Sequence, residues 1–338
     1  MKKTLFTILA VAALAGCDKE QIVTVNQEAI TFENAFVDNA TKALDPSITT
    51  TTLDGFTVYG TTQGNEASAP VVNIYPGVAV TGRVTDVDGN GNATAGTWNY
   101  DDQYTQYWIA DNTYNFAAVK NATVTTDANG MPTSLAYDAA TQTDLLYAEA
   151  TATGKASGNE AVAFTFSHLL SKVKFSFQNT SAATTNPNYT YKVTDITISG
   201  VGLTASCDVT NFSAYVWGTP TAFYTSENPL TFGSIVNNGT AENEIAFNVG
   251  SQVTKSSNYE RLLIPGDYTN IKVKARIALL YGENEVDVIN YDKTVSVKLL
   301  GGNAYNFVLQ SSIGEPIQFK VTKVEGWIEN NTQYNYNN

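Results

Sequence analysis

The chain has 338 residues, a formal net charge of −13 at pH 7 and 43% hydrophobic residues. This length allows one large or two ordinary domains, and we expect two. No basic block interrupts the acidic charge, so the sequence excludes binding to nucleic acid or to an anionic membrane surface through positive charge. Thr, Asn, Ser, Tyr and Val are plentiful, which favours strands over helices.

The N-terminus has the pattern of a lipoprotein signal. Two lysines precede an apolar run of roughly a dozen residues, too short for a bilayer core that needs about 20. Leu-Ala-Gly then stands directly before Cys17, which resembles the lipobox of bacterial lipoproteins. We expect residues 1–16 to be removed and Cys17 to be acylated and anchored in a membrane. An ordinary signal peptide with an incidental cysteine is the alternative.

Residues 17–45 are predicted to hold one strand followed by a linker. The strand is AITFENAFV at 29–37, in which alternating apolar residues indicate partial burial: Ile30, Phe32, Ala35 and Val37. A polar stretch follows and contains Lys42 and Ala43. The first β domain is then expected at 46–155.

The stretch DVDGNGN suggests a calcium site but does not complete one. Asp86, Asp88 and Asn90 are spaced like the first ligands of an EF-hand loop. Thr97 stands where the closing Glu is required, and an Asn-Gly hairpin explains the same residues. We therefore predict no bound metal.

Aromatic residues are dense at 98–118. Their default interpretation is the core of an irregular β domain. Trp98, Tyr104 and Trp108 lie among polar residues, and the alternative is that they form an exposed platform that stacks on a glycan. A short helix is expected near Thr141–Tyr147. Small and polar residues at 150–160 indicate the domain boundary, with the second β domain at 156–338.

The chain has one histidine and one cysteine besides Cys17. His168 shares the parity of Val162, Phe164 and Phe166, so it is expected to face inward at a strand end as a structural residue. Cys207 has no partner for an internal disulfide. With no metal-ligand spacing and no nucleophile motif, we expect no cofactor and no enzymatic activity.

The second half shows the period of two that is typical of sheets with one buried face. Four segments carry it: VKFSF at 173–177, IKVKARIALLY at 271–281, TVSVKL at 294–299 and YNFVL at 305–309. Short strands separated by Gly, Asn and Asp indicate an all-β chain of sandwich-like architecture.

The C-terminal segment alternates and then changes phase. Ile317, Phe319 and Val321 share one face, whereas Val324 falls on the other, which predicts a bulge or turn at Lys323. After Trp327 the tail is polar. An ordinary last strand that completes its own sheet explains the alternation.

Several stretches together resemble the fimbrillin family of Bacteroidota, lipoprotein precursors of type V pilus subunits. They are the lipobox at Cys17, the aromatic run at 98–118, DLLYAEA at 144–150, VAFTFSHLLSKVKFSF at 162–177, VTDITISGV at 193–201, ERLLIPG at 260–266, GGNAYNFVL at 301–309 and IQFKVTKVEGW at 317–327. The resemblance implies two transthyretin-like β-sandwich domains in tandem. It also implies export to the outer membrane and exposure on the cell surface.

The resemblance further implies assembly by strand exchange. A protease would cut between Lys42 and Ala43, and the strand with Ile30, Phe32 and Val37 would leave a groove. Several family pilins have Arg where Lys42 stands. Either a protease that accepts lysine processes this chain, or the protein stays a lipidated anchor.

A neighbouring subunit would fill the groove with a C-terminal donor strand at 315–328, here carrying Ile317, Phe319, Val321, Val324 and Trp327. The implied function is a structural subunit of a type V pilus or pilus-like fibre that acts in cell adhesion. The implied partners are other pilus subunits, the outer membrane through the lipid, and a host protein or glycan. The alternative is a non-polymerising outer-membrane lipoprotein that binds glycans through Trp98, Tyr104 and Trp108.

Overall fold

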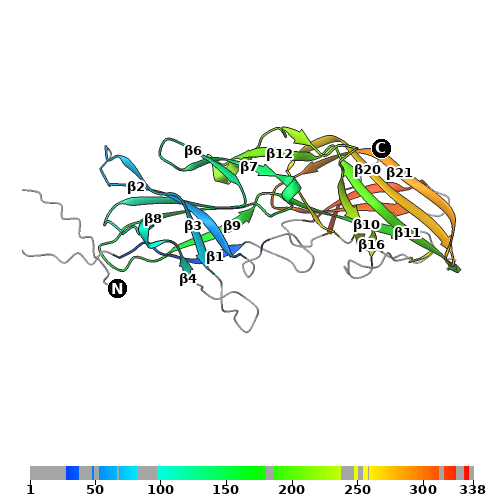
Figure 1. Ribbon diagram of the computed structural model, residues 1–338, viewed down its shortest axis with the longest axis horizontal. Helices are drawn as coiled ribbons and strands as arrows, with labels where there is room; N and C mark the ends of the chain where they lie inside the picture. The colour runs from blue at the N-terminus through cyan, green and yellow to red at the C-terminus, as the bar shows by residue number, and fades with distance from the viewer. Residues whose placement is uncertain are drawn as a thin grey trace, which may run out of the picture.

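The protein is seen in a computed structural model as an elongated molecule, with the N-terminal strands at one end and the C-terminal strands at the other (Figure 1). Cys17, Lys42, Ala43, Trp327 and the segment 86–90 lie outside the described residues. Within the described part, no helix is long and apolar enough to cross a membrane. The structure describes residues 28–37, 48, 53–66, 68–82, 97–179, 186–236, 247–249, 254–257, 259–311, 316–324 and 331–334.

The N-terminal half forms a closed barrel. Alternating side chains of its strands fill the interior, because successive residues of a strand point to opposite faces. In spatial order the strands are β1 (Phe32–Val37), β4 (Thr97–Asn99), β3 (Val71–Gly82), β2 (Gly55–Gln63), β5 (Thr113–Lys120), β8 (Leu146–Thr153) and β9 (Val162–His168).

A smaller sheet joins the two halves. It contains β13 (Val216–Trp217), β12 (Gly202–Asp208), β7 (Pro132–Asp138) and β6 (Thr123–Thr126), with β14 (Ala222–Phe223) on β12. Its core includes Ala117 and Val119 of β5, whereas Phe116 and Ala118 of that strand belong to the barrel core. Strand β5 is therefore buried on both faces.

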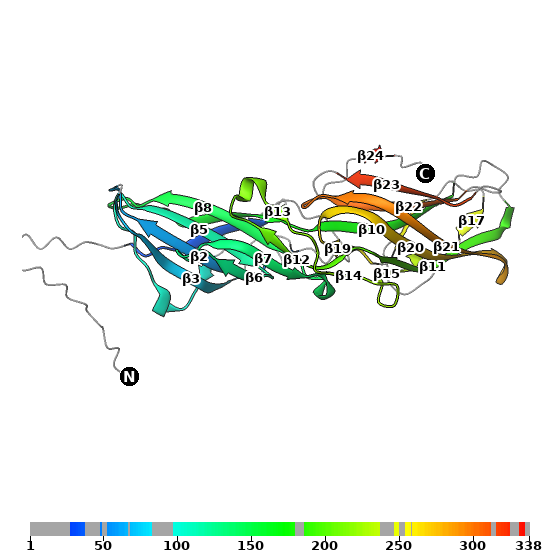
Figure 2. The ribbon, with the colours of Figure 1, turned by 90° about the horizontal axis from the view of Figure 1, so that it is seen from above.

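The C-terminal half is a sandwich of two sheets. One contains β16 (Ile235–Val236), β18 (Thr254–Ser257), β10 (Ser171–Asn179), β22 (Ala304–Ser311), β23 (Gln318–Val324) and β24 (Asn331–Tyr334), with β19 (Arg261–Leu263) on β10. The other contains β15 (Leu230–Gly233), β11 (Asn186–Ser199), β20 (Gly266–Tyr281) and β21 (Asn284–Leu299), with β17 (Phe247–Val249) on β11. Figure 2 shows β22, β23 and β24 in succession at one side of this half.

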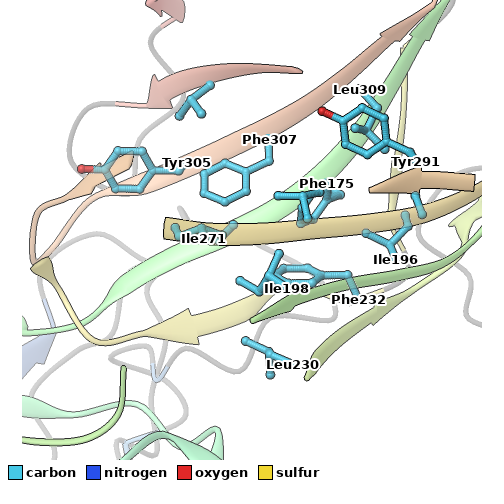
Figure 3. Close-up of a cluster of buried hydrophobic side chains, with 14 of the residues drawn as sticks. Phe175, Ile196, Ile198, Leu230, Phe232, Ile271, Tyr291, Tyr305, Phe307 and Leu309 are labelled. Carbon is cyan, nitrogen blue, oxygen red and sulfur yellow. The ribbon is translucent and has the colours of Figure 1, made fainter. Parts of the chain in front are cut away.

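The sandwich core confirms the alternation predicted from the sequence. Phe175 and Phe307 from one sheet meet Phe232 and Ile271 from the other (Figure 3). Most of the predicted inward residues are buried: Val173, Phe175, Phe177, Ile271, Val273, Ala275, Ile277, Val297, Leu299, Tyr305, Phe307 and Leu309. Leu279 and Val295 are half-buried, and Tyr281 is exposed, because the pairing of β20 with β21 has a register shift between Leu279 and Leu280. The all-β prediction is therefore confirmed.

Helical structure in the described residues is limited to three short 3-10 turns, η1 (Asp102–Tyr104), η2 (Ala139–Thr141) and η3 (Phe212–Ala214). The helix expected at Thr141–Tyr147 is wrong. The turn η2 ends at Thr141, because Gln142 takes a left-handed conformation with φ of 50°, and β8 begins at Leu146.

The structure places the division between the two halves later in the chain than residue 155, where the sequence suggested it. Strand β9 pairs with β8 and β1 in the barrel, so the barrel extends to His168. Strand β12 returns to pair with β7 of the N-terminal half. Strand β8 directly precedes β9, but the pairings of β9 with β1 and of β12 with β7 join strands far apart in the chain, for which the sequence carries no local signal.

Side-chain hydrogen bonds to the backbone fix the junction between the halves. The Gln142 side chain donates from Nε2 to the Leu262 carbonyl and accepts from the Leu262 N–H, both at 3.0 Å. Trp217 Nε1 donates to the Leu169 carbonyl at 3.0 Å. Leu262 and Leu169 are fully buried, so these backbone groups have no access to bulk water.

We expect Gln142→Ala to destabilise the protein by about 1–3 kcal/mol, because it leaves the buried N–H and C=O of Leu262 without the amide partner. Urea unfolding of the variant measures this loss. Gln103→Ala, at an exposed side chain, is the matched control and should cost about 0.5 kcal/mol or less. Equal losses in the two variants would contradict the structural role of Gln142.

Candidate functional site

Strand β1 completes the barrel through both of its edges. On one side it runs antiparallel to β4, with Phe32 opposite Trp98. On the other it runs parallel to β9, with Phe32 opposite Val162 and a register shift between Glu33 and Phe36. Without β1, the edges of β4 and β9 would have no partner at this place. The candidate site is therefore the groove that β1 fills.

The four apolar residues of this segment that the sequence predicted to be buried lie in the barrel core. Their exposed fractions are between 0% and 6%: Ile30, Phe32, Ala35 and Val37. Along the chain, successive buried positions are separated by two, three and two residues. The step of three coincides with the register shift against β9, where one extra residue is accommodated.

Phe32 is at the centre of an aromatic cage. Its ring contacts Tyr75, Tyr100 and Phe116 edge to face, at centroid distances of 5.5, 5.6 and 6.1 Å. Phe164 of β9 stacks on it at 5.9 Å. Each such aromatic pair adds about 0.5–1.5 kcal/mol beyond burial.

Gly60 of β2 leaves room for this cage. A Cβ at this position would lie 2.9 Å from the Tyr75 ring and 3.0 Å from the Phe116 ring. The cage is thus packed to the limit around Phe32, and the groove would discriminate by side-chain size.

The residues before β1 are held by the irregular segment 100–109. The Ile30 N–H donates to the Gln106 carbonyl at 2.8 Å, and the Trp108 N–H donates to the Glu28 carbonyl at 2.9 Å. The Tyr100 hydroxyl donates to the Ile30 carbonyl at 2.6 Å. This segment therefore fixes the register at which the strand enters the barrel.

Glu28 anchors the start of the strand to a turn 130 residues away. Its carboxylate accepts hydrogen bonds from the Gly158 N–H at 2.8 Å, the Asn159 N–H at 2.7 Å and the Asn159 side-chain amide at 2.8 Å. These hydrogen bonds, that of the Asn159 N–H above all, lower the pKa of Glu28 below its ordinary value. Sequence reasoning missed this residue, because no pattern links two loops so far apart.

The structure buries two of the three proposed glycan-stacking residues. Trp98 is 3% exposed and lies 5.0 Å from the Phe56 ring, and Trp108 is 7% exposed and lies 4.7 Å from the Tyr114 ring. Tyr104 is exposed. The expectation of a platform that exposes both tryptophans is wrong, because both side chains belong to the barrel core.

His168 is the inward-facing histidine that the sequence predicted. It lies at the end of β9, and its Nδ1 is 2.7 Å from Oδ2 of Asp144. The same Oδ2 accepts the Ile48 N–H at 2.8 Å. Both side chains of the pair are buried, so the pair supports the fold and is not open to a substrate.

The described residues include no group of three or more His, Cys, Asp or Glu that could hold a metal ion. Cys207 is a free, buried cysteine, and burial raises the pKa of its thiol to about 12. At neutral pH this thiol stays protonated and is a poor nucleophile.

The proposed donor strand lies in its own sheet in this structure. Strand β23 pairs with β22 on one edge and with β24 on the other. Phe319 is half-buried and contacts the Phe307 ring at 5.4 Å, and Val321 is buried. The bulge expected at Lys323 is wrong, because the pairing with β22 runs without a register shift to Val324.

We expect Phe32→Ala to destabilise the barrel by about 3–5 kcal/mol, because it leaves a cavity between four rings. Thermal or urea unfolding measures the loss. Tyr104→Ala, at an exposed aromatic side chain, should change stability by about 0.5 kcal/mol or less. A small effect of Phe32→Ala would mean that the cage collapses around the missing ring.

The anchoring by Glu28 is expected to weaken in acid. Because the pKa of Glu28 is lowered in the folded state, its contribution is present above the ordinary value of 4.5 and is lost as the pH falls through the folded-state pKa. We expect Glu28→Gln to have a lower Tm than the unchanged chain at about pH 7, and this difference to vanish by about pH 3. A difference that stays constant with pH would contradict the role of the carboxylate.

Comparison with known proteins gives a family and a fold. Residues 41–327 match the family model described as fimbrillin-like, and residues 1–17 match that of a prokaryotic membrane lipoprotein lipid attachment site. No curated protein matches the chain.

Several solved structures match most of the chain at low sequence identity. A fimbrial protein from Bacteroides vulgatus is 14% identical, with a TM-score of 0.56 over 89% of this chain and 100% of that one. A candidate cell adhesion protein from Bacteroides ovatus is 18% identical, with a TM-score of 0.48 over 92% and 100%. A fimbrial assembly protein from Parabacteroides distasonis is 13% identical, with a TM-score of 0.43 over 91% and 100%. The first of these similarities supports the fold.

Proposed function

The chain belongs to the fimbrillin-like family, and from this premise we propose that it is a structural subunit of a type V pilus or a pilus-like surface fibre. The subunit acts in cell adhesion, and the lipid on Cys17 holds it at the outer membrane before assembly. The proposal contains no catalytic step and no cofactor. The observation that carries it is the position of β1, a short strand that fills a groove between β4 and β9.

Release of β1 creates the binding site. A cut between Lys42 and Ala43 leaves β1 attached only by hydrogen bonds and packing. Its departure exposes the edges of β4 and β9 together with the apolar positions that its side chains filled. Unpaired sheet edges bind extended segments readily, because the backbone supplies hydrogen bonds to any strand of fitting shape.

The C-terminal strand of a neighbouring copy supplies the missing strand. Strand β23 lies next to the last strand of its sheet, and Ile317 and Phe319 are only half-buried there. It can leave its sheet at lower cost than a central strand such as β10, whose Val173, Phe175 and Phe177 are fully buried. In the groove the apolar side chains of the donor become buried in the positions that the side chains of β1 had filled.

The test is to isolate the full-length protein from outer membranes and to read its N-terminus and its oligomers together. We expect a terminus at Ala43 and a ladder of oligomers in samples that are not boiled. Lys42→Ala should keep the acylated Cys17 and run as a monomer, whereas Lys293→Ala, at an exposed lysine, should behave like the unchanged chain. Ladders formed by the uncut variant, or cut protein that never oligomerises, would refute strand exchange.

A further inference from the structure

We propose that residues 315–324 of a second copy occupy the place of residues 28–37 in the same chain direction and in one fixed register. Ile317 then takes the place of Ile30, Phe319 that of Phe32, and Val324 that of Val37. This inference rests on the proposed function, and it specifies which side chain enters which position of the groove.

The two segments match along ten residues. The first reads EAITFENAFV and the second reads EPIQFKVTKV. They are identical at the first, third, fifth and tenth positions, which hold Glu, Ile, Phe and Val. At three of these four positions the first segment makes its principal contacts, through the carboxylate of Glu28, the buried Ile30 and the caged Phe32.

The place of Val324 in the alternation of β23 supports this register. In its own sheet β23 pairs with β22 without a register shift, so Ile317, Phe319 and Val321 share the core side and Val324 has the opposite parity. In the groove of β1 the buried positions are spaced by two, three and two residues. Ile317, Phe319, Thr322 and Val324 have this spacing. Val324 therefore falls outside the alternation of Ile317, Phe319 and Val321 but matches the spacing of the groove.

Pro316 of the donor can occupy the position of Ala29. In the described residues the hydrogen bonds of this region use the Glu28 carbonyl and the Ile30 N–H, and none uses the Ala29 N–H. Ala29 is also exposed, so a pyrrolidine ring has space. Proline therefore costs no hydrogen bond at this position, although it would at the neighbouring one.

The aromatic cage accepts Phe319 without a change of volume. The ring of Phe32 and the ring of Phe319 are the same group, so the contacts to Tyr75, Tyr100 and Phe164 can be made again. Val321 takes the position of Asn34, inside the register shift. Ala35 is replaced by the larger Thr322, so among the four positions that the structure describes as buried this is where the donor fits less closely.

The opposite chain direction fits less well. Read backwards, Val324, Thr322, Phe319 and Ile317 have the same spacing of two, three and two residues, so the spacing does not distinguish the two directions. Side-chain size does, because a reversed strand would put Thr322 at the place of Phe32 and Phe319 at that of Ala35. The aromatic cage would then lose its central ring, and a phenyl group would stand where the barrel core holds a methyl group.

The first test places the donor sequence in the groove of the full chain itself. The graft consists of Ala29→Pro, Thr31→Gln, Glu33→Lys, Asn34→Val, Ala35→Thr and Phe36→Lys. We expect a folded monomer with a Tm within about 10 °C of the unchanged chain, the loss arising at Ala35→Thr.

The matched control shifts the same sequence by one residue, so that residues 316–325 stand at 28–37. This places Gln at position 30 and Lys at position 32, and we expect it to abolish cooperative unfolding. A shifted graft as stable as the first would overturn the register. Because neither variant needs cleavage or polymerisation, the result stands even if the proposed function fails.

The second test uses disulfides between two copies in membrane-isolated fibres. Glu33 lies opposite Ala163, and Phe36 lies opposite Thr165. Cells that produce Lys320→Cys and Ala163→Cys chains together, or Lys323→Cys and Thr165→Cys chains together, should form mixed dimers. The buried Cys207 does not compete.

Combining each donor cysteine with the other acceptor cysteine separates the possible registers of the donor strand. Mixed dimers of Lys320→Cys with Thr165→Cys, in place of the expected pairs, would mean that the donor enters in another register or in the opposite direction, and would overturn the proposed register while strand exchange stands. Fibres without any of these disulfides would overturn it as well. If no fibres form, the proposed function fails, and the grafted chains decide the register.

Discussion

The barrel of the N-terminal half depends on the hydrogen bonds that one short strand makes on both of its edges. Strand β1 pairs with β4 and with β9, and the ring of Phe32 lies between four other rings. A strand with two paired edges and a buried face does not leave a folded domain spontaneously at a useful rate. In the proposed assembly, a covalent cut would therefore be needed to release it, and another strand would have to replace it.

This constraint explains why a polar linker follows β1 and why the strand is anchored at its start. Glu28 accepts three hydrogen bonds from the turn at 158–159, and segment 100–109 holds the backbone of Ile30. Beyond the linker, the Ile48 N–H is bound by the buried Asp144. The chain is thus held on both sides of the proposed cut, and these contacts would keep the remainder of the barrel in place if the strand were exchanged.

The rest of the molecule connects the groove with the proposed donor strand. Strand β5 is buried on both faces, and the side chain of Gln142 joins the backbone of Leu262 across the junction. The groove lies in the N-terminal half, and β23 lies in the C-terminal half of the elongated molecule (Figure 2). This separation would favour pairing between copies over pairing within one chain, and repeated head-to-tail contacts of the proposed kind would build a fibre.

The sequence by itself determined the strands of the second half, the burial of Ile30 and Phe32 and the inward position of His168, because a period of two is a local property of a strand. It could not place Trp98 and Trp108, whose polar neighbours suggested exposure while the barrel buries them. Only the tertiary structure decided that β9 belongs to the barrel, that Glu28 meets Asn159 and that β1 carries a register shift. These features depend on contacts between distant residues, which no local pattern encodes.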